Sequence, residues 1–312
     1  MQRTSAIVVG LLVVVVAVVI GVILFNSGPA PEASPSPSAS PSASPSAAPS
    51  AEASFNAELL DRRWTALYVG TDQNEQRAAA GEQLNTDALM LVSLSADQSK
   101  LSLVSLPRDS VGIPLADGGT WDRKINGLYR ERGIDDLVGA METLYGVPID
   151  AHVLLDMDDF ARLVDAVDEI EVSPSDPVVD PIVNLDLAAG DQTLDGAQTL
   201  GYVRTRVDKD YGRMGRQQEV LVSLIAKFLD PETEVDLRAV LDSLDSLETD
   251  LPLDDLPTLL ELARRASTAE LETLVIQPPL ITFEGDRNDG RGYVLEPDVD
   301  AIRMEVQTLI GV

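Results

Sequence analysis

Residues 56–312 alternate between short apolar runs and longer stretches in which apolar residues recur at helical spacing. The apolar runs have the length and bounding turn residues of buried β-strands. The polar stretch 95–100 separates two of these runs and predicts a hairpin. The strands predicted in this way are 64–70, 88–94, 101–106, 152–156, 170–172, 202–206, 274–276 and 293–295.

Helical spacing predicts helices at 134–145, 158–167, 215–229 and 299–310, and two acidic amphipathic helices within 235–268. The two acidic helices are expected to be broken at Pro252 and Pro257. Strands that alternate with helices are typical of an α/β fold, in which helices cover both faces of a central mixed sheet. No repeat and no second low-complexity break interrupts the pattern, so we predict a single layered α-β-α domain over 56–312.

The start of the chain has a different pattern. Ala6–Phe25 is an unbroken run of apolar residues and glycine, and as a helix it would span roughly 30 Å, the thickness of a bilayer core. Arg3 precedes the run, and no lysine or arginine follows it until Arg62. This asymmetry predicts a cytoplasmic tail at 1–5, a retained signal anchor at 6–26 and an extracytoplasmic domain on a single-pass plasma-membrane protein.

Composition narrows the function further. Residues 27–55 are dominated by Pro, Ser and Ala, which predicts a disordered linker. The net charge of −29 argues against a nucleic-acid partner. The chain has no cysteine, which excludes thiol chemistry, and its single histidine, His152, excludes a multi-histidine metal site. We expect His152 to be a packed or capping residue.

Against this acidic background, arginines crowd into the segment 204–216. The alternation around 202–207 predicts a strand that carries Arg204 and Arg206 on one face. The helical pattern that follows places Arg213, Arg216 and Gln217 close together near its start. Guanidinium forks and the N–H groups of a helix start suit a phosphate or pyrophosphate. The segment therefore predicts an anion site, although each arginine alone could simply pair with one of the surplus carboxylates.

Other candidate residues stand next to predicted strands. Asp72 follows the first strand, Asp87 precedes the second, and Arg108 follows the third. Ligand sites in α/β sheets collect outside strand ends. Asp72 and Asp87 could hold Mg²⁺ or Mn²⁺ beside a phosphate through oxygen ligands. The alternative is that both aspartates only cap turns.

Nine short blocks, in order along the chain, resemble the LytR-CpsA-Psr family of bacterial wall-assembly proteins. The resemblance covers roughly residues 66–229, and the predicted anchor and linker also fit it. Each block alone is weak, but the ordered set is specific. The blocks are 67–72, 86–93, 103–110, 124–126, 146–150, 160–165, 194–198, 202–206 and 210–218.

The resemblance implies a phosphotransferase of cell-wall assembly. It would take a glycopolymer from a polyprenyl-pyrophosphate carrier and attach it to peptidoglycan through a phosphodiester, with a tunnel of apolar side chains for the polyprenyl chain. Asp72 and Asp87 would hold Mg²⁺ or Mn²⁺, and Asp210 would either orient an arginine or take the proton of the incoming hydroxyl. The residues placed against the pyrophosphate are Arg108, Arg204, Arg206, Arg213 and Gln217, with Arg216 added from the helical pattern.

One departure from the family matters. The family often has arginine where this chain has Asn85, so the site would lose one neutralising charge. Two alternatives stay open: a polyprenyl-pyrophosphate hydrolase, and a non-catalytic, membrane-tethered module that binds a lipid-linked glycan. Retention of the charged candidate residues argues against a decayed site. A transcriptional regulator is disfavoured by the predicted anchor, the outward topology and the acidity.

Overall fold

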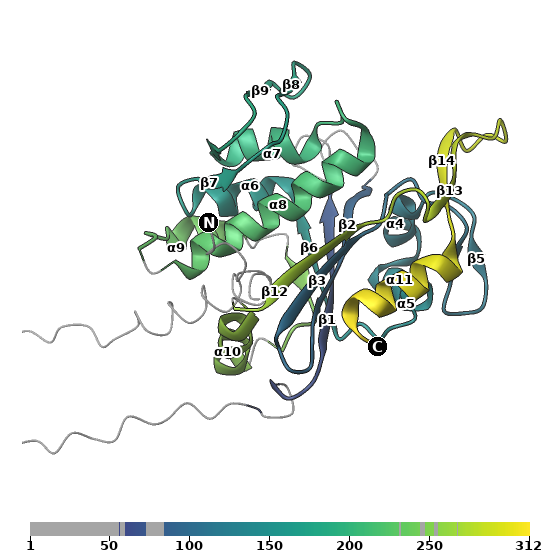
Figure 1. Ribbon diagram of the computed structural model, residues 1–312, viewed down its shortest axis with the longest axis horizontal. Helices are drawn as coiled ribbons and strands as arrows, with labels where there is room; N and C mark the ends of the chain where they lie inside the picture. The colour runs from purple at the N-terminus through teal and green to yellow at the C-terminus, as the bar shows by residue number, and fades with distance from the viewer. Residues whose placement is uncertain are drawn as a thin grey trace, which may run out of the picture.

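The computed structural model describes residues 56, 60–72, 84–230, 232–243, 247–252, 255–266 and 268–312. Their centre is a six-stranded mixed sheet of strand order β11-β6-β1-β2-β3-β12, with helices on both sides (Figure 1). The pairs β1–β6 and β3–β12 are parallel, and the other pairs are antiparallel. The strands are β1 (Trp64–Thr71), β2 (Thr86–Leu94), β3 (Lys100–Ser105), β6 (Ala151–Asp156), β11 (Glu248–Thr249) and β12 (Glu270–Val275).

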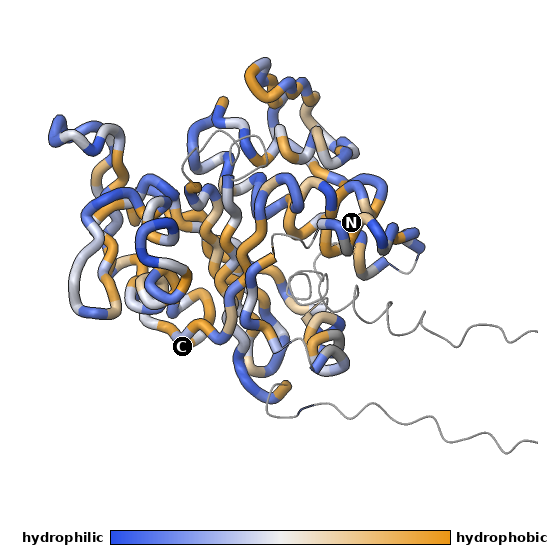
Figure 2. The backbone as a smooth tube through the Cα atoms, turned by 180° about the vertical axis from the view of Figure 1, so that it is seen from behind, coloured by the Kyte–Doolittle hydropathy of each residue, from blue (hydrophilic) through white to orange (hydrophobic). Residues whose placement is uncertain are grey.

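Both faces of this sheet are buried, which confirms the predicted α/β fold. One face carries Leu67 and Val69 and packs against α5 (Ile134–Tyr145) and α11 (Val299–Ile310). The opposite face is covered by α6 (Met157–Asp165), α7 (Gly196–Arg204), α8 (Lys209–Leu229) and α10 (Leu256–Ala266). Strands that are buried on both faces have nearly continuous apolar sequences. Figure 2 shows that hydrophobic positions are concentrated in these central strands.

Small two-stranded ribbons surround the main sheet, and most of their strands are too short for their sequences to show the alternation typical of a strand.

Within the described residues, no helix is both long enough and apolar enough to cross a membrane. The predicted anchor at 6–26 and linker at 27–55 lie outside the described residues. The remaining elements are β4 (Ile113–Pro114), β5 (Thr120–Trp121), the 3₁₀ helix η1 (Ile125–Gly127), α4 (Leu128–Arg132), β7 (Ile170–Val172), β8 (Val178–Asp180), β9 (Leu185–Leu187), β10 (Gln192–Leu194), α9 (Leu237–Asp242), β13 (Ile281–Asp286) and β14 (Tyr293–Pro297).

The predicted strand at 202–206 is wrong, because this segment is the last turn of α7 and the turn that follows it. Asp195 and Gln198 form a capping box, in which each side chain accepts a hydrogen bond from the other's backbone N–H. The helix that starts there continues to Arg204, and Thr205 is extended. Arg204 and Arg206 therefore do not share a strand face, and α8 begins at Lys209.

The predicted break at Pro257 is also wrong. This residue is the second of α10, where a proline is tolerated because the first N–H groups of a helix have no partner within the helix. Pro252 does separate β11 from α10. The predicted packing of His152 is confirmed, since its side chain is buried in β6 and Nδ1 lies 3.1 Å from Asp250 Oδ1.

The start of α7 packs against α6 with no room for a side chain. A Cβ atom on Gly196 would lie 2.3 Å from the backbone oxygen of Ala161 and 2.7 Å from the carboxylate of Asp165. The Gly196 N–H also donates to Asp165 Oδ1 at 2.7 Å. By contrast, a Cβ atom on Gly215 in α8 would meet nothing within 4 Å.

We predict that Gly196→Ala lowers the free energy of unfolding by about 1–3 kcal/mol, because α6 and α7 must separate to admit the methyl group. Gly215→Ala should raise the free energy of unfolding by about 0.5–1 kcal/mol, since alanine has the higher helix propensity. Urea denaturation of both variants tests the pair. A Gly196→Ala midpoint equal to that of the wild type would contradict the tight approach of α6 and α7.

Candidate functional site

Most of the predicted site residues lie at one end of the central strands of the main sheet, which we call the sheet edge. Because β2 runs antiparallel to both β1 and β3, the end of β1, the start of β2 and the end of β3 lie side by side. Asp72 follows β1, Asp87 is the second residue of β2, and Arg108 lies just beyond β3. The start of α8 reaches the same edge, since Arg213 Nη1 donates to the backbone oxygen of Asp87 at 2.9 Å. The structure therefore brings the separate strand-end predictions to one place.

A buried ion pair lies within the start of α8, next to these strand ends. Arg213 is only 1% exposed, and its Nε and Nη2 atoms donate to Asp210 Oδ1 at 3.1 and 2.7 Å. Burial lowers the pKa of Arg213, and the charge of Asp210 opposes that shift. Two neighbouring cations, Arg206 and Arg108, lower the pKa further, which places all three guanidinium groups within electrostatic reach of one another.

Arg108 is the second cation that faces several carboxylates. Its Nη1 donates to Asp87 Oδ1 in a short ion pair. Burial alone would lower the pKa of Arg108, but the charges of Asp87, Asp109 and Asp210 together raise it. Arg108 therefore remains charged in a partly buried position, which an anion site requires.

Some polar atoms of this cluster have bonding capacity to spare. Arg108 Nε and Asp210 Oδ2 are buried and have no hydrogen-bond partner within the described part of the chain. Arg206 is held loosely, 3.7 Å from Asp210 Oδ1, and the guanidinium of Arg204 has no partner among the described residues. Buried polar groups usually have hydrogen-bond partners, so water or a ligand is expected to complete the bonding of Arg108 Nε and Asp210 Oδ2.

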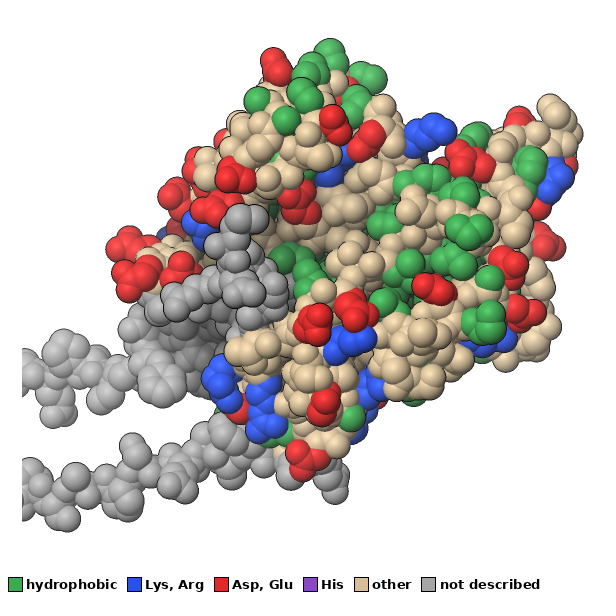
Figure 3. Space-filling view, in the orientation of Figure 1, with side chains coloured by type: hydrophobic (Ala, Val, Ile, Leu, Met, Phe, Trp, Pro, Cys, Tyr) green, Lys and Arg blue, Asp and Glu red, His purple; other side chains and the backbone are tan. Residues whose placement is uncertain are grey.

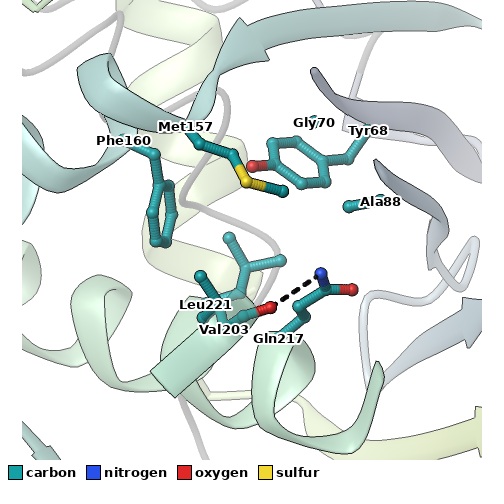
Figure 4. Close-up of a pocket in the computed structure, with 8 residues that line it drawn as sticks. All are labelled: Tyr68, Gly70, Ala88, Met157, Phe160, Val203, Gln217 and Leu221. Carbon is teal, nitrogen blue, oxygen red and sulfur yellow. Dashed lines mark hydrogen bonds between the residues drawn. The ribbon is translucent and has the colours of Figure 1, made fainter. Parts of the chain in front are cut away.

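Arg216 and Gln217 occupy different surroundings from those predicted for pyrophosphate ligands. Arg216 is buried, and its donors bond to the backbone oxygens of Tyr202 and Thr205, at 2.8 and 2.6 Å, and to Asp208 Oδ2. The Gln217 side chain donates to the backbone oxygen of Val203 at 3.3 Å (Figure 4). Both residues thus satisfy carbonyl groups at the end of α7, which fixes the turn that carries Arg204 and Arg206. Their contact with pyrophosphate stays a prediction.

Arg130 is a site residue that sequence reasoning missed. Its Nη1 donates to Asn85 Oδ1 at 2.9 Å and to the backbone oxygen of Leu84 at 3.2 Å. The backbone N–H of Asn85 in turn donates to Asp72 Oδ1 at 2.8 Å. A cation from α4 therefore lies beside the position where the sequence has Asn85. No local pattern signals this contact, because Arg130 is distant in sequence.

The metal prediction rests on few ligands. No cluster of three or more His, Cys, Asp or Glu side chains that could hold a metal occurs within the described ranges. Mg²⁺ is often bound through one or two carboxylates, with phosphate oxygens and water completing its shell. Asp72 and Asp87 lie at the same sheet edge, beside cations that would hold a phosphate, and their oxygens suit that mode of binding.

A narrow apolar pocket begins beside the charged cluster. It lies between the sheet and helices α6, α7 and α8 (Figure 4). Two residues of the sheet that line the pocket lie next to the predicted metal ligands: Gly70 is two residues before Asp72, and Ala88 directly follows Asp87. The lining residues are Tyr68, Gly70, Ala88, Met157, Phe160, Val203, Gln217 and Leu221. The candidate site therefore joins an arginine-rich group at the strand ends to a hydrophobic interior.

Comparison with known sequences finds a matching family model and relatives that are named as cell-wall proteins. A family model described as the LytR_cpsA_psr family matches residues 36–308. The probable cell wall biosynthesis protein LcpB of Corynebacterium glutamicum is 34% identical over 169 residues, which cover 52% of this chain and 40% of LcpB. TagV of Bacillus subtilis, a polyisoprenyl-teichoic acid–peptidoglycan teichoic acid transferase, is 26% identical over 262 residues, 81% of this chain and 65% of TagV. The chain thus spans less than two thirds of either relative.

Solved structures share the fold. The crystal structure of Bacillus subtilis TagV superposes with a TM-score of 0.63 at 25% identity, over 80% of this chain and 98% of that chain. A structure of TagT bound to LIIa-WTA superposes with a TM-score of 0.62 at 25% identity, over 83% of this chain and 94% of that chain. The family match extends well beyond the motif-bearing residues 66–229. The chain therefore belongs to the LytR-CpsA-Psr family.

Proposed function

We propose that this chain is a phosphotransferase that moves a glycopolymer from a polyprenyl-pyrophosphate carrier to peptidoglycan through a phosphodiester. The observation that carries the proposal is the junction of an arginine cluster with an apolar pocket. A polyprenyl pyrophosphate has the same two parts, a doubly charged head and a hydrocarbon chain. The name of TagV, and the LIIa-WTA bound to TagT, support a substrate of this class.

The arginines would act by stabilising charge. When a pyrophosphate link breaks, negative charge grows on the bridging and non-bridging oxygens, and fixed cations lower the energy of that state. One close charge pair is worth about 4 kcal/mol at an effective dielectric near 20, before desolvation costs. Arg108 and Arg204 have donors available for this task, and Arg206 is only loosely paired.

The two oxygens of Asp210 suggest two roles for one side chain. Oδ1 accepts both hydrogen bonds from Arg213 and so orients that guanidinium. Oδ2 is buried without a partner in the described residues, so it is the oxygen that would accept the proton of the incoming hydroxyl. The hydroxyl oxygen would bond to the glycan-linked phosphorus, the bond from that phosphorus to the bridging oxygen would break, and polyprenyl phosphate would leave. Asp72 and Asp87 would hold Mg²⁺ or Mn²⁺, which when bound neutralises phosphate charge.

The setting of the reaction is also part of the proposal. The signal anchor 6–26 would hold the chain in the plasma membrane, with the linker 27–55 and the catalytic domain outside the cell. A carrier lipid in the same membrane could then place its head at the arginine cluster and part of its chain in the apolar pocket.

A transfer assay tests the proposal. The full chain, purified in detergent, is incubated with a radiolabelled polyprenyl-pyrophosphate glycan and a peptidoglycan oligomer. We expect label to move to the oligomer, to stop when EDTA removes divalent cations, and to resume when Mg²⁺ is restored. Release of phosphorylated glycan with or without the oligomer would instead identify a hydrolase, and binding without turnover would identify a non-catalytic module.

We predict that Arg204→Ala lowers kcat/KM for transfer by about a hundredfold without unfolding the domain. The Arg204 guanidinium makes no bond to the described residues, so its removal leaves no buried charge unpaired. Arg213→Ala is a less informative test, because it would remove the only hydrogen-bonded cation of Asp210 among the described residues, at a cost of about 3–5 kcal/mol. Arg238→Ala, at an exposed α9 arginine with no side-chain partner in the described residues, is the matched control. Full activity of Arg204→Ala would remove this residue from the site.

We predict that Arg130→Ala lowers kcat/KM by about tenfold, or about 1.4 kcal/mol, because Arg130 is the cation bonded to Asn85. Adding Asn85→Arg to Arg130→Ala should recover most of the lost kcat/KM. The new arginine at position 85 would return a positive charge to the place that the Arg130 guanidinium occupies in the wild type. A double variant no better than Arg130→Ala would show that Arg130 only braces the segment before β2.

A further inference from the structure

Two tyrosines share one carboxylate beside the arginine cluster. Tyr211, in the first turn of α8, donates its hydroxyl to Glu284 Oε2 at 3.1 Å. Tyr293, in β14, donates to Glu284 Oε1 in a short hydrogen bond. Lys209 Nζ lies 3.8 Å from the same Oε1 atom. The start of α8 and the β13–β14 ribbon, far apart in sequence, therefore meet in one polar and aromatic group.

This group lies at the rim of the phosphate site. Tyr211 follows Asp210 directly, and β14 is bonded to the segment after β3, where the Leu295 N–H donates to the Asp109 oxygen at 3.1 Å. Partial burial and the bond to Glu284 raise the pKa of Tyr293 to about 12, and the charges of Asp109 and Asp210 add to the shift. Tyr293 is thus within electrostatic reach of Asp109 and Asp210, two of the three carboxylates that face Arg108.

Tyr293 is an exposed residue. It is 48% exposed, and no other aromatic residue in the described ranges is as exposed. Figure 3 shows hydrophobic side chains, a class that includes tyrosine, gathered where the β13–β14 ribbon meets the body of the domain. The hydrogen bond from Tyr293 lowers the pKa of Glu284; partial desolvation opposes this shift, and the hydrogen bond from Tyr211 adds to it. The Glu284 carboxylate is therefore ionised and can accept further hydrogen bonds.

We propose that Tyr211, Glu284 and Tyr293 form a saccharide subsite at the rim of the phosphate site. The open face of Tyr293 packs against the C–H face of a pyranose ring, and Glu284 accepts hydrogen bonds from sugar hydroxyl or amide groups. The proposal rests on the proposed transferase function, because it places the sugar next to the transferred phosphate. The same chemistry suits the peptidoglycan acceptor and the first sugars of the lipid-linked donor.

Binding of two separate probes tests the subsite on the full chain in detergent. Isothermal titration with N-acetylglucosamine tetramer measures saccharide binding, and titration with inorganic pyrophosphate measures the anion site. We expect Tyr293→Ala to weaken tetramer binding by about tenfold, because a large aromatic anchor is lost, and to leave pyrophosphate binding unchanged. Tyr293→Phe keeps the ring and should weaken tetramer binding by less than about threefold. Met304→Ala, at an exposed residue of α11, is the control for loss of exposed apolar area.

Transfer kinetics then distinguish the source of the sugar. A higher KM for the peptidoglycan oligomer in Tyr293→Ala, with the donor KM unchanged, assigns the subsite to the acceptor. A higher KM for the lipid-linked glycan alone assigns it to the donor.

The subsite is overturned if the wild type does not bind the tetramer, or if Tyr293→Ala binds it as tightly as the wild type. Unchanged values of KM for both substrates in Tyr293→Ala would also overturn it. The proposed transferase function can fail separately. If Tyr293 governs tetramer binding but the wild type neither binds pyrophosphate nor transfers the glycan, the subsite stands and the transferase does not.

Discussion

The site depends on the buried pair of Arg213 and Asp210. A guanidinium that is 1% exposed is tolerated only because Asp210 neutralises it and the Asp87 backbone oxygen accepts a further hydrogen bond. Those bonds tie the first turn of α8 to the start of β2. Arg108, which is paired with Asp87, and Tyr211, which follows Asp210, are consequently held in fixed relation to the same sheet edge. The pair thus combines two roles, since it supplies local charge and sets the position of the surrounding groups.

The chemistry changes abruptly along the strands that form this edge. Gly70 of β1 lines the apolar pocket, and Asp72, two residues later, follows the end of that strand. In β2 the charged Asp87 is followed directly by Ala88, which lines the pocket. A sheet buried on both faces supplies the dry interior, while its edge exposes the polar ends of the strands. An amphiphilic carrier lipid matches that gradient, because its charged and apolar parts are also directly adjacent.

Much of the fold could be predicted from local periodicity, and the failures have local causes. The helices at 134–145 and 299–310 were predicted with the observed bounds, because each has a sustained apolar stripe and a clear end. The strand prediction for 202–206 was wrong because, over so few residues, the end of a helix followed by an extended residue has the same alternation of apolar and polar residues as a strand. The charged residues of the site could be found from their motifs. The carbonyl contacts of Arg216 could not, because they depend on α7 ending at Arg204, where the local pattern predicted a strand. The contacts of Arg130 and Glu284 with the site could not, because they join segments far apart in the sequence.

The parallel pairing of β3 with β12 has a consequence for the order of folding. These strands are neighbours in the sheet, yet β12 is made only after β6, the ribbons β4–β5, β7–β10 and β8–β9, and helices α4 to α10 have been synthesised. Contacts between such distant segments carry a large loop-closure cost and slow the folding rate. Until β12 arrives, β3 is an open hydrophobic edge of the kind that promotes aggregation. The chain is therefore exposed to pairing with other chains along β3 until β12 takes its place beside it.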